Sequence, residues 1–354
     1  GLTALLLSGR PRWRLAALVP ATVLIAALVF QGDLIRFPRK VMLEKIARSG
    51  EILAEGDGLE AHVAVNQNGF GFRQLWVNGD VVARSTGSVS GHNMLSHLPM
   101  LLARENRKAV VIALGTGISA GTVSLYEPET LDVVEISELV LDHVHLFSHD
   151  NYDLARNPRV RFVIDDGRNF VQVTGQDYDV VAAEPLHPWK AGVANLYTKE
   201  YYELCRGLLR DGGIVVQWIP LYGLSDQDAR DLTATFCAVF PETSYWLFGL
   251  DAVLLGHTEP FAVDLPLLRD RMSAKAVEAD LDKVNVRGQL DLLHHLVMGP
   301  KELPAYCAGA RVMSDWHPFL EYDGPKHVHS KVPNTDILLG LRAHRCDPAE
   351  YVGE

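Results

Sequence analysis

The chain has 354 residues, of which 48% are hydrophobic, and its formal net charge is −11. This length and apolar content suffice for one large domain with a buried core plus appended segments, and they exclude global disorder. The negative charge excludes broad nucleic-acid binding, which requires a basic surface that displaces counterions. The four cysteines show no CxxC spacing, which favours a reducing compartment.

The N-terminal segment contains 18 consecutive uncharged residues from Leu15 to Gly32. A run of this length is just sufficient to cross the hydrocarbon core of a bilayer. We therefore predict a transmembrane segment in residues 1–32, as the end of a longer membrane region, followed by a basic connector over 33–49. A signal peptide and a buried helix are the alternatives, but no small-x-small cleavage site follows. The small excess of Arg and Lys after the span predicts an inner or cytoplasmic membrane protein whose catalytic domain faces the cytoplasm.

Residues 50–107 are predicted to form a small antiparallel β unit. Short alternating runs are separated by Gly and Asn turns, and Asn78-Gly79 lies between two runs typical of strands. An Asn-Gly pair in this position is a strong hairpin signal.

From residue 108 to 260 the pattern changes to apolar runs of strand length separated by helix-length segments. Continuous apolar runs are typical of buried parallel strands with helices on both faces of the sheet. The pattern predicts an α/β fold with a Rossmann-like, methyltransferase-type sheet of seven strands, five parallel and two in a closing hairpin. Residues 261–354 are a less regular C-terminal extension. The predicted strands are 109–114, 131–136, 160–164, 178–183, 213–219, 243–248 and 251–257.

A glycine-rich turn, Gly115-Thr116-Gly117, follows the first of these strands. Its glycines allow a tight turn and close approach of a ligand to the backbone. Glu135 follows 20 residues after Gly115, at the end of the next strand, where a carboxylate accepts both ribose hydroxyls. With Ala120 the run also satisfies the looser dinucleotide pattern GxGxxA, so NAD is an alternative cofactor.

The third strand ends in Asp165-Asp166-Gly167. An acidic residue there accepts the adenine amino group in enzymes of adenosyl sulfonium compounds, whereas a dinucleotide fold has no standing need for it. The combined spacing favours a site for S-adenosylmethionine. Asp166 has a second interpretation as the N-cap of a following helix, and capping is compatible with binding.

Several segments in the same order resemble the spermidine synthase, or polyamine aminopropyltransferase, family, and in particular its membrane-fused bacterial members. The resemblance covers roughly residues 50–260. It rests on Gly91-His92-Asn93-Met94 with Ser96-His97-Leu98-Pro99, on Asp166-Gly167, and on the segment from Asn195 to Tyr202. The segment from Ser314 to Tyr322 resembles a C-terminal signature of the fused members.

The resemblance implies aminopropyl transfer from decarboxylated S-adenosylmethionine, but this chain departs from the family at its acidic residues. In the hexapeptide Glu184-Pro185-Leu186-His187-Pro188-Trp189, the first catalytic aspartate corresponds to Glu184 and the second to His187. Other acidic or tyrosine positions of the family correspond to Gly87, Ser88, Gly91, Asn93 and Thr116. A dicationic amine would be desolvated in this pocket without partners.

These departures favour an enzyme that acts on S-adenosylmethionine as its substrate and releases 5′-methylthioadenosine without a polyamine acceptor. In one version the substrate's own carboxylate displaces the thioether, which gives homoserine lactone, and proximity favours this cyclisation. The alternatives are an aminopropyltransferase that uses decarboxylated S-adenosylmethionine, a methyltransferase, and a non-catalytic sensor of the cofactor. Glu184, His187 and Tyr197 are the predicted catalytic residues.

The adenosyl compound is predicted to bind Gly115, Thr116, Gly117, Glu135, Asp166, Gly167, His92 and Trp189. His187 and Trp189 also have structural interpretations, as a loop histidine and as core or cap, and Tyr197 as an aromatic packing residue. Gln217 and Trp218 are further candidates, and Asp315 is expected either to cap the Trp316 turn or to pair with a pocket arginine. The partners predicted are a small-molecule substrate, the membrane and a second copy of the chain in a homodimer. We predict no metal site, because the paired histidines lack a ligand spacing and the chemistry needs no metal.

Overall fold

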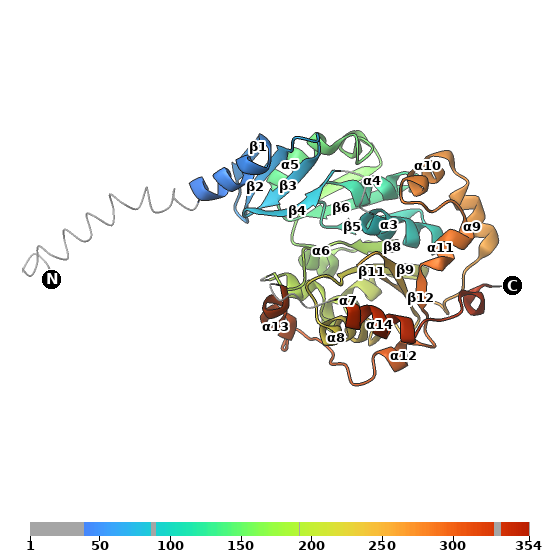
Figure 1. Cartoon of the computed structure of the whole chain (residues 1–354). Helices are drawn as coiled ribbons and strands as arrows, with labels where there is room; N and C mark the ends of the chain where they lie inside the picture. The colour runs from blue at the N-terminus through green and yellow to red at the C-terminus, as the bar shows by residue number, and fades with distance from the viewer. Residues whose placement is uncertain (1–38, 86–89, 191, 329–333, 354) are drawn as a thin grey trace, which may run out of the picture.

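Two β-sheets and the helices around them make up the computed structural model, which describes residues 39–85, 90–190, 192–328 and 334–353 (Figure 1). Residues 39–49 are helical. The small sheet is antiparallel with the order β1-β2-β3-β4. Its strands are β1 Glu51–Asp57, β2 His62–Gln67, β3 Arg73–Val77 and β4 Asp80–Arg84.

The turn between β3 and β4 is the hairpin that the sequence predicts. Asn78 and Gly79 both have positive φ, 52° and 81°, and β3 pairs with β4 on either side of them. Two consecutive positive φ angles define the turn whose twist matches that of the flanking strands, and Asn-Gly adopts it readily.

The large sheet has the order β12-β10-β11-β9-β8-β5-β6-β7. The five strands β5 to β9 are parallel, and β10 and β11 close the sheet as an antiparallel pair beside β9, as predicted. The prediction of seven strands is one short, because the C-terminal extension adds β12 antiparallel to β10. The strands are β5 Lys108–Ile112, β6 Thr130–Glu135, β7 Val160–Ile164, β8 Tyr178–Ala183, β9 Leu209–Pro220, β10 Thr243–Phe248, β11 Asp251–His257 and β12 Leu296–Met298.

Helices cover both faces of the large sheet (Figure 1). The α-helices are α3 Ser90–Leu102, α4 Ile118–Ser124, α5 Glu138–His143, α6 Gly167–Val173, α7 Lys199–Gly207, α8 Asp226–Cys237, α9 Leu265–Met272, α10 Lys275–Lys283, α11 Gln289–His294, α12 Leu303–Tyr306, α13 Phe319–Val328 and α14 Thr335–Ala343. The 3₁₀ helices are η1 Val144–Phe147, η2 Leu154–Arg156, η3 Val193–Leu196 and η4 Pro348–Tyr351.

Alternate residues of the central strands enter two separate hydrophobic clusters. Val111 of β5 belongs to the cluster formed with α3, α4, α9, α10, α11 and the small sheet. Its neighbour Val110 belongs to the cluster formed with α6, α7, α8 and the helices α12 to α14. Burial on both faces explains why these strands are continuous apolar runs in the sequence.

The prediction of an N-terminal transmembrane helix, and with it the membrane localisation, is corrected. Within residues 39–85, 90–190, 192–328 and 334–353, no helix combines the length and the apolar character needed to cross a membrane. The run from Leu15 to Gly32, on which the prediction rested, lies outside the described residues. The length of an apolar run is only a necessary condition for a membrane span, and we do not retain the prediction.

Candidate active site

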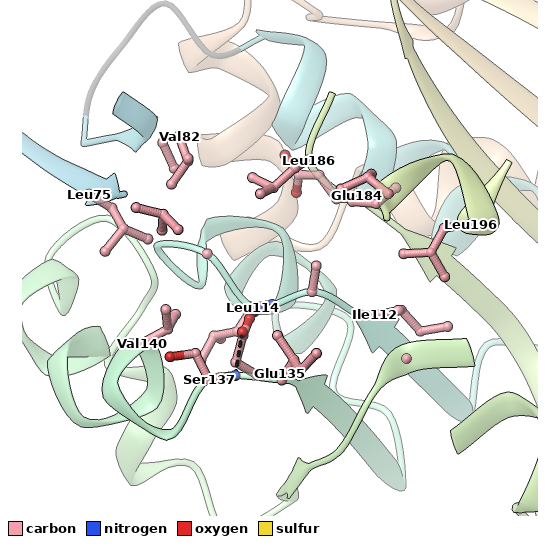
Figure 2. Close-up of a pocket in the computed structure, with 18 of the residues that line it drawn as sticks. Leu75, Val82, Ile112, Leu114, Glu135, Ser137, Val140, Glu184, Leu186 and Leu196 are labelled. Atoms are coloured by element: carbon pink, nitrogen blue, oxygen red, sulfur yellow. Dashed lines mark hydrogen bonds between the residues drawn. The ribbon is translucent and has the colours of Figure 1, made fainter. Parts of the chain in front are cut away.

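A cavity of about 500 Å³ lies at the carboxyl ends of the parallel strands, where ligands bind in open α/β folds. Its walls come from the segments that follow β5, β6, β7 and β8, from η3, and from apolar side chains of the small sheet. In the view of Figure 2, Leu75 and Val82 lie at one end, Ile112 and Leu196 lie at the other, and Glu135 lies between them.

The turn after β5 forms one wall of the cavity. Gly115 and Thr116 line the cavity, and Gly115 has a φ of 54°, which favours glycine. Gly117 is not among the lining residues. Its φ is 80°, and a Cβ there would lie 2.9 Å from Val144. Gly117 is therefore required by the packing under the turn, whereas Gly115 and Thr116 face the space for a ligand.

Glu135 lies at the end of β6 with its carboxylate at the cavity wall (Figure 2). The backbone N–H groups of Leu114 and Ser137 each donate to it at 2.9 Å. Burial raises the pKa of Glu135, and the backbone donors oppose this rise. These donors fix the carboxylate in place, and its remaining lone pairs are available to hydroxyl groups.

Asp166 lies after β7, caps α6 and also lines the cavity. Its Oδ1 accepts the backbone N–H groups of Arg168 and Asn169, each at 2.9 Å. The two interpretations of this residue therefore coexist, because one carboxylate oxygen serves the cap. Gly167 packs directly on Ile112, so a side chain at this position would displace a residue of the cavity floor.

The C-terminal extension reaches this edge of the cavity through Asp315. Arg168, which lines the cavity, binds Asp315 with both guanidinium nitrogens, at 2.9 Å and 2.5 Å. The same guanidinium donates to the carbonyl oxygen of Asn195 at 2.7 Å, and Thr198 donates to Asp315 at 2.8 Å. Of the two alternatives for Asp315, the pairing with a pocket arginine is observed. It ties α6 to the segment around η3.

Glu184 follows β8, and its carboxylate is held by two side chains. Nδ1 of His92 contacts Oε1, and the Ser119 hydroxyl donates to Oε2. Burial lowers the pKa of His92 to about 4, and in the neutral ring an Nδ1–H would donate to the carboxylate. All three side chains line the cavity. The sequence interpretation did not select Ser119, although Ser119 belongs to the glycine-rich run and lies in the first turn of α4.

His187 lines the cavity within a group of aromatic rings. Its ring centre lies 4.7 Å from that of Trp189 and 5.5 Å from that of Trp218, and its Nε2 is 3.2 Å from the Tyr222 hydroxyl. Burial and the nearby Lys190 lower the pKa of His187 to about 4. This histidine therefore adds a neutral, flat surface to the cavity.

Two predicted site residues lie behind the cavity wall. Tyr197 is fully buried, is not among the lining residues, and donates from its hydroxyl to the carbonyl oxygen of Leu186 at 3.4 Å. Burial holds the pKa of Tyr197 well above 10. Trp189 is also not among the lining residues and packs against Gly324 of α13. Both residues support the loop after β8, and neither faces the ligand space.

The two candidates on β9 differ in their positions. Trp218 lines the cavity, and its indole N–H donates to Asp251 at 2.9 Å. Gln217 is fully buried, is not among the lining residues, and donates to the carbonyl oxygen of Trp218 at 3.1 Å. Adjacent strand residues point to opposite faces of a sheet, which explains this difference.

Thr116 and Asn93 stand where the family resemblance predicts acidic residues, and neither brings an acidic group to the cavity. Thr116 lines it as a neutral side chain. Asn93 is not among the lining residues and donates to Asp280 at 3.0 Å. Gly87 and Ser88 lie outside the described residues. The acidic side chains that line the cavity are Glu60, Glu135, Asp166 and Glu184.

The part of the chain that the structure describes contains no candidate metal site. No group of three or more His, Cys, Asp or Glu side chains there is arranged to hold a metal ion.

A comparison with known families gives a match that covers most of the residues that line the cavity. Residues 89–253 match the family described as "Spermine/spermidine synthase domain". These residues include the glycine turn, Glu135, Asp166 and Glu184. They also include β5 to β10 and the first three residues of β11.

Among curated proteins, the chain is similar to polyamine aminopropyltransferases. The protein of that name from Alkaliphilus oremlandii is 29% identical over 173 residues, which are 45% of this chain and 61% of that protein. The one from Enterobacter sp. (strain 638) is 29% identical over 221 residues, 61% of this chain and 75% of that protein. The chain thus spans less than two thirds of the length of the first relative.

Two solved structures share the fold. A spermidine synthase in complex with the transition state analogue AdoDATO aligns with a TM-score of 0.56 and 17% identity, over 73% of this chain and 87% of that one. Spermidine synthase from Thermotoga maritima aligns with a TM-score of 0.52 and 20% identity, over 59% of this chain and 73% of that one. At this identity the similarity is evidence for the fold.

Proposed function

This chain belongs to the spermine/spermidine synthase family through residues 89–253, and from that premise we propose that it cleaves S-adenosylmethionine and releases 5′-methylthioadenosine without a polyamine acceptor. The observation that carries the proposal is the position and hydrogen bonding of Glu184. It is the single acidic side chain in the lining segment after β8, and both of its oxygens already have donors.

The adenosyl part of the substrate fits the end of the cavity formed by the segments after β5, β6 and β7. Glu135 would accept the ribose hydroxyls, and Asp166 has one carboxylate oxygen outside the helix cap for the adenine amino group. Leu196 and Ile112 supply apolar contact for the base. Mostly apolar walls with a few placed polar groups are typical of small-molecule sites.

A polyamine is a poor fit for the other end. Leu75, Val82 and Leu186 form its walls, and burial lowers the pKa of the nearby histidines His92 and His187 to about 4. Each ammonium group that enters such a site loses its hydration, and an unpaired buried cation is strongly unfavourable. One ammonium has a partner in Glu184. The lining carboxylate beside the small sheet, Glu60, is exposed, so a second ammonium has no buried partner there.

Cleavage without an acceptor needs no base. The α-carboxylate of the substrate attacks its own γ-carbon, a C–O bond forms, and the C–S bond breaks with its electron pair going to sulfur. The products are a neutral thioether, 5′-methylthioadenosine, and homoserine lactone that keeps its ammonium group. No proton is transferred. Glu184 would hold the ammonium group so that the carboxylate approaches the γ-carbon, which makes the reaction a matter of orientation.

The donors on Glu184 favour this role over that of a base. The hydrogen bonds from two side chains hold the carboxylate in one orientation, as a group that orients a substrate ammonium requires. An aminopropyl transfer requires removal of a proton from the attacking ammonium before the new C–N bond forms. Aminopropyl transfer from decarboxylated S-adenosylmethionine is the second candidate. Its support is the printed name of the relatives, polyamine aminopropyltransferase.

The test is to incubate the purified protein with S-adenosylmethionine alone in ¹⁸O-labelled water and to identify the products by mass spectrometry. We expect equal amounts of 5′-methylthioadenosine and homoserine lactone, with no ¹⁸O in the lactone that is trapped before it hydrolyses. Appearance of ¹⁸O in a γ-hydroxyl group would indicate attack by water, and S-adenosylhomocysteine would indicate methyl transfer. Either result would contradict the proposal.

A further inference from the structure

A buried carboxylate of the C-terminal extension, Asp280 of α10, lies behind the candidate active site. Its exposed fraction is 1%, and its pKa is held well below the usual range by its hydrogen bonds, against the effect of burial. Oδ2 accepts from Asn93 and His97 at 3.0 Å each and from Thr122 at 3.4 Å. Oδ1 accepts from the Tyr152 hydroxyl and from Lys283 at 3.0 Å.

The donors to Oδ2 belong to the two helices that also hold Glu184. Asn93 follows His92 in α3. Thr122 lies three residues after Ser119 in α4, a spacing that places two side chains on the same side of a helix. A further hydrogen bond joins the helices nearby, from the Ser96 hydroxyl to the carbonyl oxygen of Ser119 at 2.8 Å.

Both ring nitrogens of the histidine in this network have hydrogen-bond partners. Nε2 of His97 donates to Asp280, and Nδ1 accepts from the Tyr126 hydroxyl at 2.7 Å. His97 is completely buried, and burial lowers its pKa. The carboxylate therefore keeps its charge against a set of fixed donors, and a fixed set of donors defines the separation and rotation of the helices that carry them.

We propose that Asp280 is a positioning residue for the active site. By holding α3 and α4 in register, it places Nδ1 of His92 and the hydroxyl of Ser119 on the carboxylate of Glu184. The inference rests on the proposed function only in that Glu184 acts on the substrate. It assigns to the C-terminal extension, outside residues 89–253, a part in the geometry of the reaction.

The experiment combines NMR of histidine-labelled protein with turnover, in Asp280→Asn and in wild type. The His92 signal is assigned by its loss in His92→Gln, and we expect it to report a protonated Nδ1 in wild type. In Asp280→Asn we expect this signal to change, and we expect kcat to fall about tenfold or more while the Kd for 5′-methylthioadenosine stays within about twofold. A His92 signal and a kcat equal to wild type would overturn the proposal.

Two further comparisons keep the test decisive. Glu278→Gln removes a charge from the exposed side of the same helix and should leave both readouts unchanged. If Asp280→Asn does not fold, Asn93→Leu removes one donor on α3, and Tyr152→Phe removes one donor outside α3 and α4. We expect the first to shift the His92 signal and the second to lower the Tm only. Equal effects of the two on the His92 signal would contradict positioning.

The two proposals fail separately. If wild-type protein releases no 5′-methylthioadenosine, the proposed function is wrong, and the His92 signal still tests the placement of the ring by Asp280.

Discussion

The two ends of the cavity are built in different ways. At the adenosyl end, backbone N–H groups hold both Glu135 and Asp166. The donors to Asp166 lie two and three residues after it, and those to Glu135 come from Ser137 and from Leu114, which follows the neighbouring strand β5. At the other end, Glu184 is fixed by side chains 65 and 92 residues away, since its partners are Ser119 and His92.

This difference separates what is general in the fold from what is specific to the chain. Backbone donors do not change when side chains are substituted, so the adenosyl end tolerates divergence. The Glu184 end depends on helix placement and on side chains that are easily exchanged. We therefore expect substitutions at the two ends to affect different steps, ligand binding at one and turnover at the other.

The largest effect is expected for Glu184→Gln. The amide keeps the size of the side chain but loses the charge that would hold the substrate's ammonium, so kcat should fall on the order of 100-fold. The Kd for 5′-methylthioadenosine, which has no ammonium group, should stay within about twofold. Steady-state kinetics and calorimetry measure the two quantities. Glu203→Gln, on the exposed surface of α7, is the matched control. Retained turnover in Glu184→Gln would refute the role of this carboxylate.

At the adenosyl end, Glu135→Gln should act mainly on binding. A hydrogen bond to a charged group contributes about 1.5–3 kcal/mol, so we expect the Kd for 5′-methylthioadenosine to rise about 10- to 100-fold. Glu138→Gln removes an exposed carboxylate three residues away and should leave the Kd unchanged. An unchanged Kd in Glu135→Gln would mean that the ribose does not bind here.

A smaller effect on the same end is expected for Asp315→Asn. Loss of charge weakens the bidentate pair with Arg168 and loosens the link to the segment around η3. Because the pair is partly exposed, we expect a rise of about 3- to 10-fold in the Kd for 5′-methylthioadenosine. Glu350→Gln breaks another ion pair of the extension, with Lys301, and serves as the control. Equal effects of the two variants would show that Asp315 acts through general stability.

The smallest effect is a pH dependence of stability. The pKa of His187 is about 4 in the folded chain and near 6.5 when unfolded. The unfolded chain therefore binds more protons between these values, and stability falls as the pH drops from about 6.5 toward 4. His187→Gln should reduce the fall in Tm between pH 7 and pH 5 by about 2 °C, after allowance for partial exposure. His149→Gln, at an exposed histidine, should leave this fall in Tm unchanged. A steeper fall in Tm in His187→Gln than in wild type would contradict burial as the cause of the lowered pKa of His187.

Local patterns predicted most of the fold and one end of the site. Continuous apolar runs located the strands of the large sheet up to β11, Asn78-Gly79 located a hairpin, and Asp166 was recognisable as a cap. The three residues of β12 are too short a run to give a periodic signal, and their pairing with β10 is set by the packing of the extension.

The other end of the site depends on contacts that no local pattern contains. Ser119 is one of several small residues in the glycine-rich run, and only the fold brings it to Glu184. Trp189 has the sequence position of a pocket residue, yet α13 packs against it and it does not line the cavity. Asp280 lies in the extension, 187 residues from Asn93, and its role in joining α3 to α4 depends on tertiary structure.

The most direct test of the central claim is a comparison of two rates of 5′-methylthioadenosine release by the same preparation. One reaction contains S-adenosylmethionine alone, and the other contains decarboxylated S-adenosylmethionine with putrescine. We predict the higher kcat/KM in the first reaction, and we predict that added putrescine leaves that rate unchanged. Release that occurs only in the second reaction, in proportion to putrescine, would contradict the account and establish aminopropyl transfer.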